Sequence, residues 1–145
     1  MGYLIAALSG ILMSLQGILN TEVTKQTSVW VSAAWVQVTA LAVSVIAWKV
    51  TGGSSFLAIK DVTPRYMLLG GVIGAFITIT VIISMGSVGP AQATMFIVVA
   101  QVIFSWLVEL MGLFGVEKTP FSWSKVVGMV LAIAGMIIFK WEINR

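Results

Sequence analysis

Hydrophobic residues in this sequence form five long runs that are separated by short polar segments. The runs cover residues 3–20, 29–50, 66–86, 91–114 and 123–141. Each is close to the roughly 20 apolar residues that a helix needs to cross a lipid bilayer. All three prolines (Pro64, Pro90 and Pro120) fall between the runs, where the missing backbone N–H costs little. The pattern predicts an all-α integral membrane protein in which residues 1–145 form a single domain of five transmembrane helices.

The fifth run is the shortest in its uncharged part, which covers only the 14 residues 126–139. A stretch of that length is also typical of an interfacial helix that lies on the membrane surface. Lys125 and Lys140 can extend their ammonium groups to the headgroups, and Trp123 and Trp141 can anchor the two ends. We therefore expect the fifth run to span the bilayer.

Composition excludes several function classes. Hydrophobic residues make up 59% of the chain and charged residues 9%, whereas soluble domains are about 25% charged. A soluble enzyme and a nucleic-acid-binding protein are poor interpretations, because the net charge is only +3 and its basic residues are scattered. The chain has no cysteine and no histidine, which removes thiolate and imidazole catalysis and nearly all zinc chemistry. We expect no enzyme activity, no cofactor and no metal.

The charges between the runs only weakly define an orientation. Five spans place the two termini on opposite sides of the membrane. One side then carries Lys49, Lys60, Arg65, Lys118 and Lys125, and the other carries Lys25, Lys140 and Arg145. The positive-inside rule favours a cytoplasmic amino terminus. So small a difference is also typical of a protein that inserts in both orientations, and chance alone would produce it as well.

Polar side chains recur on one face of three predicted helices, at about 100° per residue. These stripes contain Ser9, Met13, Gln16 and Asn20; Trp30, Gln37 and Ser44; and Thr94, Gln101, Ser105 and Glu109. Polar groups in hydrocarbon are costly unless they face a partner or water. The stripes predict a shared aqueous cavity in which Gln16, Asn20, Gln37, Gln101 and Ser105 bind a solute. Such residues also join neighbouring helices, at about 0.6–2 kcal/mol each, and Asn20 could instead cap the end of its helix.

Glu109 is the one charged residue well inside a run, and we expect it to bind a proton or a cationic group. Its distance from the middle of the run, roughly 9 Å along the helix, leaves a hydrated interfacial position as the alternative. Small residues that let helices approach closely predict helix packing or dimerisation. They are Gly70, Gly74, Gly128, Ala132 and Gly135. Trp35 and Trp106 lie off the stripes, and we expect them to pack rather than to form an aromatic cation box.

Four segments resemble a known transporter family. They are Gln16-Gly-Ile-Leu-Asn20, Gln101 with Glu109-Leu-Met-Gly112-Leu-Phe-Gly115, Pro120-x-Ser-x-x-x-x-x-Gly128, and the helix Gly128–Gly135. Their order and spacing are similar to those of the half-sized, five-helix YdcZ-like family of the drug/metabolite transporter superfamily. Two positions depart from the family pattern: Glu109 stands where the family usually has Asp, and Leu110 where it usually has His.

The resemblance implies a ten-helix transporter that is built from two five-helix halves in opposite orientations. The second half would be another copy, in an antiparallel homodimer, or a homologous chain, in a heterodimer. The resemblance also implies a secondary transporter of the bacterial inner membrane that exports a small organic solute, with a cationic solute or an exchanged proton at Glu109. Its partners would be the lipid bilayer and this solute, with no nucleic acid. The alternatives are a small dual-topology ion channel lined by the stripes and a non-transporting membrane subunit.

Overall fold

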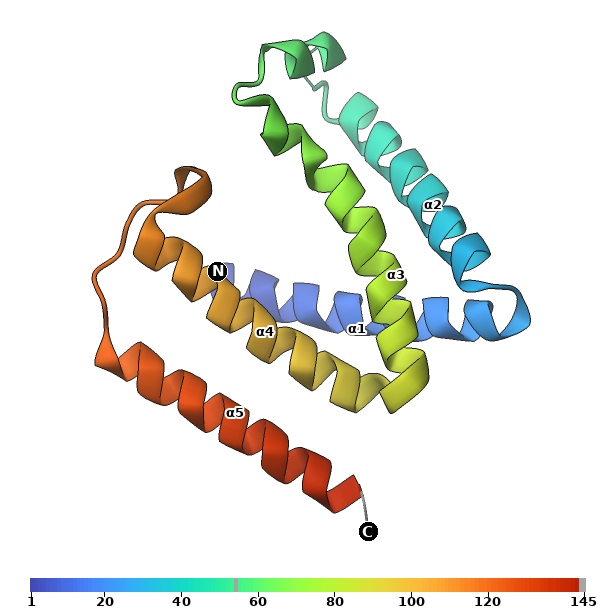
Figure 1. The fold of residues 1–145 in the computed structure, drawn as a ribbon. Coiled ribbons are helices and arrows are strands. Elements are labelled where there is room, and N and C mark those ends of the chain that lie inside the picture. Colours follow the sequence, from blue (N-terminus) through green and yellow to red (C-terminus); the bar gives the residue numbers. More distant parts are fainter. Residues whose placement is uncertain (54, 144–145) are drawn as a thin grey trace. The chain divides into compact units, whose positions relative to one another are not determined.

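The computed structural model of the chain describes residues 1–53 and 55–143, and their regular structure is entirely helical. The long helices are α1 (Gly2–Gln26), α2 (Val29–Val50), α3 (Gly70–Val88), α4 (Pro90–Met111) and α5 (Trp123–Ile143) (Figure 1). Three short 3₁₀ helices lie between them: η1 (Phe56–Asp61), η2 (Arg65–Leu69) and η3 (Leu113–Gly115). Arg145, which entered the charge balance above, lies outside the described residues.

Five helices of the described chain are long and apolar enough to cross a membrane, which confirms that part of the prediction. The third of these spans includes η2 and runs from residue 65 to residue 88. Besides the start of α3, which η2 precedes, two helix ends differ from the apolar runs by three residues or more. α1 continues past residue 20 to Gln26, and α4 stops at Met111 instead of residue 114.

Each difference has a local physical reason. Beyond residue 20, α1 satisfies its polar side chains internally: Thr21 Oγ1 donates to the Gly17 carbonyl at 2.8 Å, and Lys25 pairs with Glu22 at 2.6 Å. A helix can therefore continue after hydrophobicity ends. α4 ends because Gly112 has a φ of +65°, a left-handed conformation that glycine adopts without steric cost.

Residues 1–87, with helices α1 to α3, form one compact unit. α1 and α2 are joined by a tight turn at which the Ser28 hydroxyl accepts a hydrogen bond from the Val31 N–H at 3.2 Å and caps α2. Next to the turn, the buried Ser32 hydroxyl donates to the Asn20 carbonyl oxygen at 2.9 Å. This bond joins the two helices near the turn, and from there they diverge (Figure 1).

The carboxyl-terminal half of α3 crosses α1 at Gly17, where Ile82 and Met85 are buried. A Cβ atom built on Gly17 would lie 2.6 Å from the Met85 side chain and 3.2 Å from Val81 Cγ1. Real Cβ atoms essentially never approach other atoms to 2.6 Å, and a contact of 3.2 Å is tighter than most. Glycine at position 17 thus allows the close approach of α3 to α1.

This crossing gives a testable prediction on one helix. Gly10, which also lies in α1, has nothing within 4 Å of a built Cβ, so Gly10→Ala should stabilise the helix by roughly 0.5–1 kcal/mol. Gly17→Ala should be less stable than Gly10→Ala by about 1–2 kcal/mol, because the added methyl must displace Met85. Unfolding in mixed detergent measures both variants. Equal stability of the two would contradict the crossing, and Gly17→Leu should disrupt it altogether.

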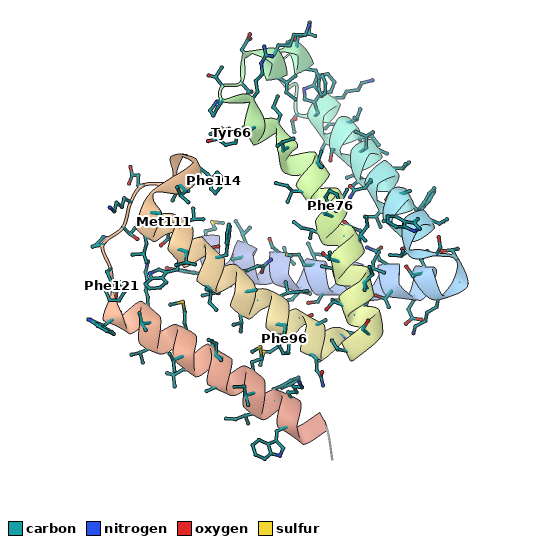
Figure 2. All side chains as sticks on the ribbon, in the orientation of Figure 1. Tyr66, Phe76, Phe96, Met111, Phe114 and Phe121 are labelled. Atoms are coloured by element: carbon teal, nitrogen blue, oxygen red, sulfur yellow. The ribbon has the colours of Figure 1, made fainter. Side chains whose placement is uncertain are left out.

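The second compact unit begins at Val88 and contains α4, η3 and α5. The segment 112–122 folds back on the end of α4, where the Thr119 N–H donates to the Glu109 carbonyl oxygen at 3.0 Å. The Phe121 ring contacts Trp106 of α4, with centroids 5.7 Å apart, and Trp123 of α5, at 5.2 Å. Figure 2 shows Phe121 at the end of this segment, beside the start of α5. These contacts hold the 112–122 segment between the two helices.

Candidate functional site

One pocket lies between α4 and α5 within the second unit, and we call it the α4–α5 pocket. Its volume is about 440 Å³. Its lining residues are Gln101, Val102, Ser105, Trp106, Glu109, Lys125, Gly128 and Met129. The structure therefore brings together three residues of the fourth-run stripe, Gln101, Ser105 and Glu109, on the wall of a single pocket.

Glu109 forms an ion pair in this pocket. Its Oε2 accepts a hydrogen bond from Lys125 Nζ at 2.8 Å, and the two side chains are 39% and 44% exposed. Ion pairs that are open to this extent contribute only about 0–1 kcal/mol, so the pair can separate at little cost. From the sequence, Lys125 is expected only to extend its ammonium group to the headgroups. The positions of the two residues along the chain indicate this pair. Glu109 lies near the end of α4 and Lys125 near the start of α5, and the connection between two antiparallel helices brings these ends side by side.

Trp106 has a second feature besides its packing against Phe121. Its side chain lines the α4–α5 pocket, and its indole Nε1 is buried without a hydrogen-bond partner among the described residues. A buried N–H without an acceptor costs about 1–3 kcal/mol. Trp106 therefore packs against Phe121, as expected, and its side chain also lines the pocket that Glu109 lines.

A second pocket, the α1–α2 pocket, lies where these two helices diverge. Its volume is about 730 Å³. Its polar and aromatic lining residues are Gln16, Asn20, Trp35, Thr39 and Ser44, and the others are aliphatic or methionine. Trp35, which was expected only to pack, lines this pocket. No charged residue lines it, so its chemistry is that of hydrogen bonding and apolar contact.

The surroundings of two predicted site residues, Asn20 and Gln37, differ from what the sequence suggests. Asn20 is buried, and α1 continues beyond it to Gln26, so the alternative that Asn20 caps the helix is wrong. Gln37 does not line the α1–α2 pocket. Its Nε2 instead donates to Thr78 Oγ1 of α3 at 3.4 Å, and Thr78 in turn donates to the Gly74 carbonyl. Gln37 therefore connects α2 to α3, which is the interhelical role that amides also have in membranes.

The predicted small-residue faces have little contact within the described chain. A Cβ built at Gly70, Gly74, Gly128 or Gly135 meets nothing within 4 Å there, and Ala132 is exposed. Gly128 instead lines the α4–α5 pocket. A contact with a second chain stays the prediction for the remaining positions.

The described residues contain no group of three or more acidic residues that could hold a metal ion. The chemistry of the two pockets is therefore that of amides, hydroxyls, indoles and one acid–base pair. Such an arrangement can bind a polar solute and a charged group reversibly.

A comparison with protein-family models matches residues 1–138 to the family described as "Putative inner membrane exporter, YdcZ". Comparisons with curated proteins and with solved structures give no match. The family match covers both pockets and favours a transporter over an enzyme. It agrees with the resemblance seen in the sequence and with five membrane-spanning helices. The chain belongs to the YdcZ family of the drug/metabolite transporter type and is a multi-pass protein of the inner membrane.

Proposed function

We propose that the protein is a secondary transporter that exports a small organic solute by alternating access. The α4–α5 pocket is the observation that carries this proposal, because it combines the amide of Gln101, the hydroxyl of Ser105 and the carboxylate of Glu109. The family description supports export as the direction of transport.

The transporter would be formed by two five-helix chains in opposite orientations. Inverted repeats of this kind have a binding site between the halves and expose it alternately to the two sides of the membrane. An odd number of spans and a nearly even distribution of basic residues support the antiparallel arrangement. The antiparallel homodimer is the simplest form, and a homologous partner chain would give a heterodimer.

The two pockets have different roles in this proposal, since one offers hydrogen bonds and the other offers charged groups. Gln16 and Asn20 give the uncharged α1–α2 pocket hydrogen-bonding groups that suit a neutral polar solute group. Glu109 handles charge, because a carboxylate can exchange Lys125 for a proton or for a cationic group of the solute. Gln37 would contribute to binding only after it releases Thr78, and we propose that its main role is to hold α2 against α3.

Proteoliposomes loaded with a cellular metabolite extract test the proposal. A pH gradient should drive the loss of specific small solutes from protein-containing vesicles and not from empty ones, as measured by mass spectrometry. Turnover distinguishes the ion-channel alternative, since alternating access waits for domain motions of microseconds to milliseconds whereas a channel does not. Absence of flux for every solute in the extract would contradict transport and favour a non-transporting subunit.

A further inference from the structure

The α4–α5 pocket presents one negative and one positive side chain within hydrogen-bond distance. Glu109 and Lys125 are the charged residues among those that line it, so the pocket as a whole carries no net charge. A pocket with Glu109 as its one charged residue would attract a cation. The lysine changes the class of solute that the pocket suits.

Both charged groups keep capacity for further bonds. Within the described chain, each side chain makes the one hydrogen bond that joins it to the other. A carboxylate can accept several hydrogen bonds, and an ammonium group can donate three. Because the two side chains are 39% and 44% exposed, an incoming solute can reach both of them.

Charge pairing distinguishes three kinds of solute. A monocation that binds Glu109 displaces Lys125 and leaves its ammonium group unpaired, and a monoanion that binds Lys125 leaves the carboxylate unpaired. Either solute therefore pairs with one of the two charges and leaves the other to water alone. A solute that carries both charges can insert between the two side chains and leave neither of them without a partner.

We propose, as an extension of the transport function above, that this pocket binds a small zwitterion. Glu109 holds the ammonium end of the solute, and Lys125 holds its carboxylate end.

A purely structural role for the ion pair is the alternative. The 112–122 segment, which leads into α5, is already attached to α4 by two other contacts, the Thr119 N–H to the Glu109 carbonyl at 3.0 Å and the Trp106–Phe121 ring contact at 5.7 Å. An open ion pair adds little to such a connection. The pair is therefore better suited to a ligand than to holding α4 and α5 together.

Four probes that share one phenyl scaffold test the charge preference: phenylalanine, phenethylamine, 3-phenylpropionate and 3-phenylpropionamide. Binding to the purified full-length protein in nanodiscs is measured by titration calorimetry. Phenylalanine, the zwitterion, should bind at least about tenfold more tightly than the cation, the anion or the neutral amide.

Two single variants should shift the preference in opposite directions. Glu109→Gln leaves the pocket positive, so 3-phenylpropionate should become the tightest probe. Lys125→Gln leaves it negative, so phenethylamine should become the tightest. Lys25→Gln is the matched control, because it removes the 2.6 Å pair with Glu22 on α1, outside both pockets. The Lys25→Gln protein should still bind phenylalanine most tightly, as the original protein does.

A charge exchange tests whether the single variants merely misfold. The double variant Glu109→Lys with Lys125→Glu keeps both charges in the pocket and should still prefer phenylalanine. Equal binding of the four probes, binding of none of them, or tightest binding of phenethylamine by the original protein would overturn the inference. Flux of metabolites without a preference for zwitterions would leave transport standing and reject only the solute class. Zwitterion binding without any flux would reject transport alone.

Discussion

Glu109→Gln is expected to abolish proton-coupled solute flux while the chain remains folded in the membrane. Glutamine has nearly the shape of glutamate but neither exchanges a proton nor pairs its charge with Lys125, which lies 2.8 Å from Glu109. The group that takes up and releases the proton is then absent, so the initial rate should fall to that of vesicles without protein. The measurement is the pH-gradient-driven rate in proteoliposomes, for a solute identified from the metabolite extract.

Two further variants show whether the loss belongs to this carboxylate. Glu109→Asp should retain activity, because the acid is kept and related family sequences usually have Asp at this position. Glu22→Gln removes the acid of the exposed Glu22–Lys25 ion pair on α1 and should leave the rate unchanged. A Glu109→Gln protein with an unchanged rate and an unchanged pH dependence would mean that the acid is merely hydrated and that the amides alone recognise the solute.

A single cysteine at either end of this cysteine-free chain is expected to be labelled from both sides of the inner membrane. Five spans put the two ends on opposite sides, and the near balance of basic residues permits both orientations. Gly2→Cys and a cysteine appended to the carboxyl terminus provide the two reporters. A membrane-impermeant maleimide is applied to whole cells and to inverted vesicles, and the labelled fractions are compared.

Added charge provides the control for orientation. Two lysines introduced between α2 and η2, for instance Ser55→Lys with Val62→Lys, should fix the amino terminus in the cytoplasm and limit labelling of Gly2→Cys to inverted vesicles. If antiparallel pairing is required, flux should also be lost in this variant. One orientation of the original chain with full activity would instead require a partner chain or a parallel assembly.

Hydropathy predicted the five helices because their length and lack of charge are properties of each segment alone. It could not predict where the helices end. Leu113 and Phe114 continue the apolar run, yet the left-handed φ of +65° at Gly112 ends α4 before them. In the other direction, Thr21 and the residues after it are polar but remain helical, because polarity decides the position in the membrane and not the backbone conformation.

The candidate site divides in a similar way. Gln101, Ser105 and Glu109 share one face of one helix, so helical periodicity alone placed them together, and they line one pocket. Helical periodicity also placed Gln37 on the stripe of its own helix. It could not predict the bond to Thr78, because that bond depends on where α3 lies. The ion pair of Lys125 with Glu109 also depends on the position of a neighbouring helix, and so do the places of Trp35 and Trp106 in the pocket linings. Which helix lies opposite is tertiary information that the period of one helix does not contain.

Thr119 provides a natural reporter beside Glu109. Its backbone N–H donates to the Glu109 carbonyl oxygen at 3.0 Å, so the same residue that pairs with Lys125 also holds the 112–122 segment. The amide hydrogen of Thr119 exchanges with deuterium only when this hydrogen bond opens. The exchange rate of this one amide therefore counts how often the segment lifts from α4, without any added label and before the natural solute is known.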